Sequence, residues 1–238
     1  FCGLYGHKPS FGRVPFYPQS SPAVCAGPIA RSVADAARLL TIISRPDGRD
    51  PTALPFDEVD YEAVIMGETT KKKIGFMRNI GFGPTPDEEV LRLCETAVKV
   101  FESMGNEIQD ISSPFKNEDL TKAENFYKVR TLAELDLLPP KIQEKGMVIN
   151  TWAIEAKHYN GLDHYRDYLG TQDLRSRMFK AMEGYDLLLL PTVPIPPYAA
   201  ENPGLDDGDI FSPWSNTFVF NLTQQPAISV PCGKTSSG

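Results

Sequence analysis

The sequence predicts an α/β fold with a mixed, mainly parallel central sheet that helices cover. Three observations support this class. Residues 73–111 have the pattern of a strand, a helix and a second strand, which is the order of a parallel crossover. Residues 187–190 are four consecutive leucines, and such an uninterrupted apolar run is typical of a central parallel strand. Predicted strands and helices also alternate along the rest of the chain.

The crossover between residues 73 and 111 has clear local signals. Residues 73–77 form its first strand. Thr85-Pro86-Asp87-Glu88 then predicts a helix start, with Thr85 as the cap and Pro86 at the first helical position. Apolar residues at helical spacing follow, and Gly105 ends the helix. Residues 107–111 are the next strand, which a right-handed connection places parallel to the first.

The remaining elements follow from glycine, proline and apolar spacing. Residues 1–31 are rich in glycine and proline, which predicts turns and close backbone approaches. Ser32 caps a helix in a capping-box pattern with Asp35, and residues 46–51 end it. Further along, we expect helices at 118–137, 147–159, 162–183 and 214–224, a proline-rich loop at 191–213, and a buried strand at 227–231.

Composition limits the classes of function. The chain has 238 residues, with 24 Lys and Arg against 31 Asp and Glu, a net charge of −7. Such a balance argues against nucleic acid as a partner, since phosphates need a basic face, and against docking on anionic membranes. No apolar run approaches the roughly 18 residues that span a bilayer. The length fits one domain or part of one, and a homodimer stays open.

The four cysteines are Cys2, Cys25, Cys94 and Cys232, and their wide spacing forms no CxxC pair. We expect reduced, mostly buried thiols in a cytoplasmic protein.

A search for catalytic or metal-binding motifs finds no convincing arrangement, so no metal is expected. Cys2 and His7 are close in sequence, but a thiol nucleophile needs a base paired in space, and a structural role is preferred. His158 and His164 do not share one helix face. The acidic residues of Asp206-Asp207-Gly208-Asp209 lack the alternation of a calcium loop, so a solvated loop is preferred.

Five segments resemble, in order, the conserved blocks of the amidase signature family. Residues 1–15 resemble the end of its signature, CGxxGxKP(T/S)xGRV. The other four are similar to its GP(M/I)ARSVAD block, the loop that follows it, its YDxLLxPT strand and its NLxxxPAISVP block: residues 27–35, 49–52, 185–192 and 221–231. The middle of the chain, about residues 112–180, carries no family motif.

This resemblance implies an amidase that hydrolyses a carboxylic amide through a serine acyl-enzyme, without metal or organic cofactor. The family uses a Lys, a Ser in a cis peptide and a nucleophilic Ser, and all three precede the block at which residue 1 stands. No residue here is therefore assigned a catalytic role, and Lys8 and Ser10 are structural. Residues 1–238 are expected to be the C-terminal portion of a single amidase-signature domain with an incomplete fold, inactive alone.

The resemblance also suggests where this chain meets a small-molecule amide substrate. Members of the family that use glutamine carry an acid seven residues before the Asn of the NLxxxP block, and Trp214 stands there. We therefore expect Trp214 and Phe218 to contact an apolar or aromatic substrate, with ordinary core packing as the competing interpretation. Two alternatives remain: the glutaminase subunit of a tRNA-dependent amidotransferase, although no DGxRYG stretch is present, and a non-catalytic interaction module.

Overall fold

The computed structural model describes residues 2–18, 23–145, 147–199, 201, 204–205 and 209–237. Its strands form two three-stranded sheets. One is parallel, with the order β4-β3-β5, and consists of β3 (Lys73–Phe76), β4 (Glu107–Asp110) and β5 (Leu187–Leu189). The other is antiparallel, with the order β2-β1-β6, and consists of β1 (Tyr5–Lys8), β2 (Ile29–Ala30) and β6 (Ala227–Ser229). With the helices around them, these sheets confirm the α/β class.

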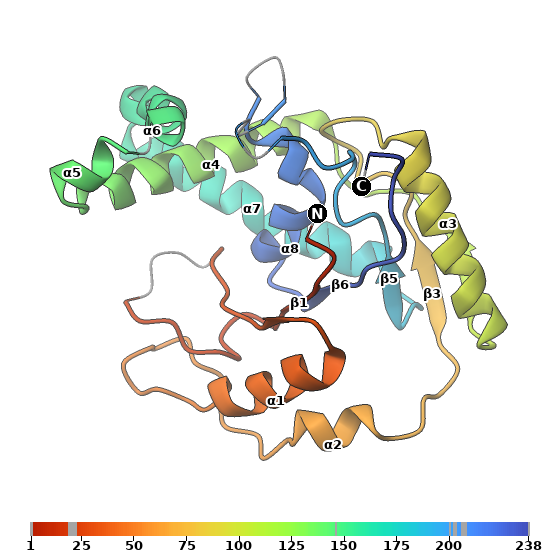
Figure 1. Ribbon diagram of the computed structural model, residues 1–238. Coiled ribbons are helices and arrows are strands. Elements are labelled where there is room, and N and C mark those ends of the chain that lie inside the picture. The colour runs from red at the N-terminus through yellow and green to blue at the C-terminus, as the bar shows by residue number, and fades with distance from the viewer. Residues whose placement is uncertain are drawn as a thin grey trace.

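Several of the helices lie together in one group, and the others lie apart from it (Figure 1). The long helices α4 (Asn117–Asp136) and α7 (Gly161–Ala181) pack on each other, and α6 (Met147–Ile154) and the 3₁₀ helix η1 (Glu155–His158) pack on α4. Helix α8 (Ser215–Leu222) packs on α7 and follows the 3₁₀ helix η2 (Ser212–Trp214). The other helices are α1 (Val33–Ile43), α2 (Tyr61–Ile65), α3 (Glu88–Ser103) and α5 (Pro140–Gln143).

The predicted crossover between residues 73 and 111 is present, with β3 and β4 paired in parallel through Ile74 and Ile108. The predicted start of its helix was wrong by two residues. Asp87 rather than Thr85 is the N-cap, since its carboxylate accepts the backbone N–H groups of Glu89 (2.8 Å) and Val90 (3.2 Å). A carboxylate satisfies these free N–H groups and also suits the positive end of the helix dipole.

The start of α1 matches the prediction more closely. The Ser32 hydroxyl accepts the backbone N–H of Asp35 at 3.1 Å and donates to the Asp35 carboxylate at 2.7 Å. The close backbone approaches expected near the N-terminus are also present. A Cβ added at Gly27 would lie 2.0 Å from the carbonyl oxygen of His7, so only glycine allows these segments to meet.

Two strand predictions were wrong about burial. Residues 187–190 were expected to be a central strand, but β5 is at an edge of its sheet and Leu187 is 48% exposed. Residues 227–231 were expected to be buried, but Ile228 and Val230 are exposed. Both strands pair with one neighbour among the described strands, so one edge of each is left open.

The four cysteines were also predicted wrongly as mostly buried: Cys2 and Cys232 are exposed, and Cys25 and Cys94 are half-buried. None of the helices in the described part of the chain has the length and apolar character needed to cross a membrane.

The hydrophobic core lies around α4, α7 and α8 and the residues that follow β3. Its members are mainly aromatic and long apolar side chains: Met77, Ile80, Phe82, Phe115, Phe126, Tyr127, Leu174, Met178, Phe211, Phe218, Val219 and Phe220. This core fixes the segment that leads into η2 and α8, where the candidate site lies.

Candidate substrate-facing site

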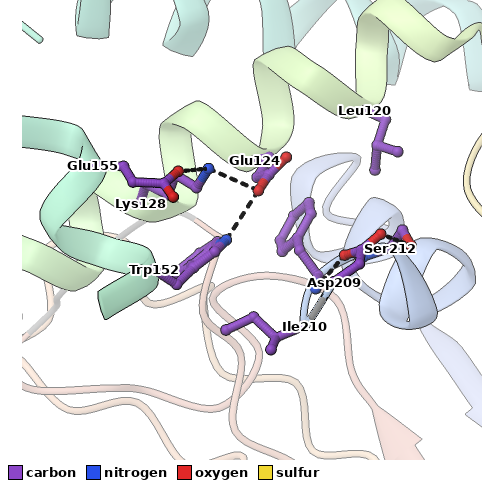
Figure 2. A pocket seen from close by; sticks show the side chains of 9 residues that line it. Leu120, Glu124, Lys128, Trp152, Glu155, Asp209, Ile210 and Ser212 are labelled. Atoms are coloured by element: carbon purple, nitrogen blue, oxygen red, sulfur yellow. Dashed lines mark hydrogen bonds and ion pairs between the residues drawn. The ribbon is translucent and has the colours of Figure 1, made fainter. Parts of the chain in front are cut away.

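A pocket of about 320 Å³ opens between α4, the α6–η1 turn and the segment before η2. Its volume lies at the lower end of the range for small-molecule sites. Figure 2 shows side chains from these three parts of the chain converging on it. The lining residues are Leu120, Glu124, Lys128, Trp152, Glu155, Asp209, Ile210, Phe211 and Ser212.

One wall of the pocket is a charged cluster centred on Lys128. Its ammonium lies 2.9 Å from Glu124 Oε1 and 2.6 Å from Glu155 Oε2, and it lies over the Trp152 ring at 5.7 Å. Trp152 Nε1 donates to Glu124 Oε1 at 2.9 Å, as Figure 2 shows. Burial works to lower the pKa of Lys128, but hydrogen bonds with Glu155 and Glu124 outweigh it and raise that pKa. The wall therefore holds a permanent positive charge between two carboxylates.

The opposite wall is a turn that Asp209 holds in shape. Its Oδ1 accepts the backbone N–H groups of Phe211 and Ser212, both at 2.9 Å, and the Ser212 hydroxyl donates to Oδ2. Residues 206–208 of the candidate acidic loop lie outside the described residues. Among the residues that the structure describes, no group of three His, Cys, Asp or Glu side chains is placed to hold a metal ion.

Behind the pocket, aromatic rings form a continuous stack. The Phe211 ring lies 5.7 Å from the Trp152 ring and 4.5 Å from the Phe218 ring, with interplanar angles of 23° in both pairs. Phe218 continues onto Phe82 at 5.8 Å, with the rings nearly parallel. Offset stacks of this kind stabilise one arrangement of the wall beyond simple burial.

The two residues expected to contact substrate are Trp214, in η2, and Phe218, in α8, and their surroundings differ. Phe218 is 6% exposed, and its ring supports Phe211 from the core side. Trp214 is 42% exposed at the end of η2. Of the two, Trp214 thus offers an accessible indole face, and the substrate contact of both stays a prediction.

The pocket also contains residues that the sequence did not indicate. Glu124, Lys128 and Trp152 come from the stretch between residues 112 and 180, where no family block was recognised, and only the structure brings them to Phe211. The other candidates lie elsewhere. His7 is in β1, with its pKa lowered by burial and by the charge of Lys8, and the His164 ring stacks on Phe126 at 5.5 Å.

Tyr127 offers a pH-dependent test of the packing behind the pocket. Burial raises the pKa of this phenol to about 12, although the nearby Arg130 charge works to lower it. In the unfolded chain the phenol ionises near pH 10. The folded state should therefore lose stability as the pH rises from about 10 to 12, and Tyr127→Phe should remove that part of the loss. Urea unfolding at several pH values measures it, and identical pH dependence in the variant would show that Tyr127 is not buried.

The whole length of the chain matches one protein family. A family model described as Amidase matches residues 1–238. The chain therefore belongs to the amidase family, the amidase signature enzymes.

Among curated relatives, the acylamidase of Rhodococcus erythropolis is 29% identical, and the match covers 100% of this chain and 52% of that protein. The glutamyl-tRNA(Gln) amidotransferase subunit of Synechococcus sp. (strain CC9902) is 28% identical, with 100% of this chain and 54% of that protein covered. The chain thus spans about half the length of the curated relatives it matches.

Solved structures agree on the fold. A bacterial aryl acylamidase of the amidase signature family has a TM-score of 0.81 at 24% identity, with 98% of this chain and 52% of that chain covered. The 6-aminohexanoate cyclic dimer hydrolase has a TM-score of 0.79 at 22% identity, with 100% and 55% covered.

Proposed function

We propose that this chain is the C-terminal portion of an amidohydrolase domain that cleaves a carboxylic amide to an acid and ammonia or an amine. The membership in the amidase family supports this proposal, as do the five conserved blocks in family order. The reaction runs through a serine acyl-enzyme. A Lys, acting through a second Ser, removes the proton of the nucleophilic Ser, which attacks the amide carbonyl, and water later hydrolyses the ester. The proposal assigns these three residues to polypeptide N-terminal to Phe1.

The contribution of this chain to the reaction is a framework and a substrate-facing wall. Preorganised backbone N–H groups, worth about 3–4 kcal/mol each in comparable sites, come from the same preceding stretch. In this proposal Trp214, Phe211 and Phe218 contribute to substrate binding and not to the chemical step. Trp214 offers an apolar face, and the stacked Phe211 and Phe218 rings fix the segment that carries it.

One observation carries the preference for a neutral, apolar or aromatic acyl group: an exposed indole, Trp214, stands seven residues before Asn221. The family resemblance places an acid at that position in members that use glutamine. An indole cannot pair with a substrate ammonium group as a carboxylate does, but it adds apolar contact area.

The isolated chain is expected to hydrolyse no amide, because the proposal assigns the nucleophile and the oxyanion-binding groups to polypeptide outside residues 1–238. Release of p-nitroaniline from an acyl p-nitroanilide measures this, with the protein extended by the preceding polypeptide as the positive control. Turnover by purified residues 1–238 that persists through repeated purification would contradict the proposal.

A serine-reactive fluorophosphonate gives an independent test in the extended protein. The label should map to a serine N-terminal to Phe1. A stoichiometric label on a serine within residues 1–238 would assign the nucleophile to this chain and overturn the proposal.

A second candidate function is that of the glutaminase component of an amidotransferase. Several of the relatives are named as subunits of glutamyl-tRNA(Gln) amidotransferase, which favours it. Trp214 argues against it, because an indole at this position cannot pair with the α-ammonium group of glutamine as an acidic side chain would. Hydrolysis of glutamine that a partner protein stimulates would support this candidate over the first.

A further inference from the structure

The segment Pro231–Ser237, here called the 231–237 segment, lies along α3. The backbone N–H and the hydroxyl of Ser236 donate to the two carboxylate oxygens of Glu89, at 2.9 and 3.0 Å. A Cβ added at Gly233 would lie 2.6 Å from Leu93 Cδ2, so the backbone there touches the helix. Figure 1 shows this segment ending beside the N-terminal end of α3.

These contacts fix the direction in which the segment runs. Gly233 lies at Leu93 and Ser236 lies one turn earlier, at Glu89, so the segment runs antiparallel to α3. Cys232 precedes Gly233 and Cys94 follows Leu93, which brings the two thiols to the same level of the helix. The charge of Cys232 is among the causes that raise the pKa of Cys94, which agrees with this placement. One thiol is exposed and the other half-buried, and both are free.

We propose that Cys94 and Cys232 form a thiol pair that low-molecular-weight disulfides of the glutathione class oxidise to a disulfide, which ties the 231–237 segment to α3. The exposed Cys232 thiolate attacks one sulfur of the oxidised reagent, forming a mixed disulfide and releasing one thiolate. Cys94 then loses its proton and attacks the Cys232 sulfur, which displaces the second reagent thiolate. Two protein thiols are oxidised and one reagent disulfide is reduced to two thiols.

The order of the two steps follows from the surroundings of each sulfur. The pKa of Cys94 is raised to about 12, first by burial, then by the charge of Cys232 and its hydrogen bond, and by the charge of Glu95. Cys94 is thus a poor first nucleophile, because thiolate is the reactive form. Once Cys232 is a mixed disulfide its sulfur cannot ionise, so the contribution of its charge to the raised pKa of Cys94 is removed. Cys94 then acts as the resolving thiol.

Trypsin separates the pair cleanly for a direct test. Cleavage after Arg92 and Lys99 gives the peptide Leu93–Lys99, and cleavage after Lys180 and Lys234 gives Ala181–Lys234; each contains one cysteine. After the intact protein reacts with oxidised glutathione and free thiols are blocked, mass spectrometry should find these two peptides linked. Cys232 bearing a persistent glutathione adduct, with Cys94 reduced, would overturn the proposal. So would a link between two copies of the chain.

Two variants test whether Cys94 is the thiol that resolves the mixed disulfide on Cys232. In Cys94→Ser the glutathione adduct should remain on Cys232, because the resolving thiol is gone. In the matched control Cys25→Ser, the linked peptides should form at the rate of the unaltered protein. Loss of the Cys232 adduct in Cys94→Ser would show that another group resolves it and would contradict the assigned pair.

Discussion

Asp119→Ala is expected to destabilise the protein by about 3 kcal/mol, the lower end of the cost of breaking a buried ion pair. The Asp119 side chain is 9% exposed and accepts two hydrogen bonds from Arg177, at 2.6 and 3.0 Å. It also accepts the backbone N–H of Lys116 at 2.8 Å, which completes the start of α4. The substitution removes the N3 acceptor for the backbone N–H of the N-cap residue and leaves the guanidinium of Arg177 with fewer partners.

The estimate stays near the lower end because Arg177 keeps other partners. It donates to the carbonyl oxygen of Pro114 at 2.7 Å and pairs with Asp173 at 2.7 Å. Asp173 is the matched control, since it shares Arg177 but its side chain is 64% exposed. Asp173→Ala should cost at most about 1 kcal/mol, the range for solvent-exposed pairs. Urea unfolding measures both, and equal costs would show that the Asp119 pair is not buried in solution.

The parts of the fold that the sequence predicted well are those set by local chemistry. The start of α1 depends on Ser32 and Asp35, three residues apart, and the cap forms as expected. The crossover of residues 73–111 follows from apolar spacing within one continuous stretch. The wrong prediction of Thr85 as the cap of α3 also arises from local chemistry. Thr85 and Asp87 both have side chains that can cap a helix, and the Asp87 carboxylate is the stronger acceptor.

Burial and the pocket could not be predicted in the same way. Ile228 and Leu187 are in strands with apolar sequences, but their exposure depends on how many neighbouring strands are present, which no local pattern records. The pocket joins Lys128 and Trp152 to Phe211 across α4, α6 and the segment before η2. That meeting is a result of helix packing. The sequence predicted a substrate contact for Trp214 from its position before the NLxxxP block, but Trp214 is not among the residues that line this pocket, and its contact with substrate stays a prediction.

Trp214→Asp is expected to shift the substrate preference of the full enzyme toward amides with an α-ammonium group. If the proposed function holds, a carboxylate at position 214 forms a charge-assisted hydrogen bond with such a group, worth about 1.5–3 kcal/mol. The ratio of kcat/KM for an α-amino amide to that of its desamino analogue should then rise about 10- to 100-fold. Folding should tolerate the change, since Trp214 is the N-cap of α8 without a side-chain hydrogen bond, and Asp is a favoured cap.

The control for this prediction is Trp214→Asn, which removes the indole and introduces no charge. It should weaken turnover of aromatic amides, as the Asp variant does, while leaving the preference for the α-ammonium group nearly unchanged. The difference between the two variants isolates the charge from the loss of apolar contact. If both variants keep the original substrate profile, Trp214 does not face the substrate. The aromatic stack of Phe211 and Phe218 would then act only in packing, which agrees with the burial of both rings.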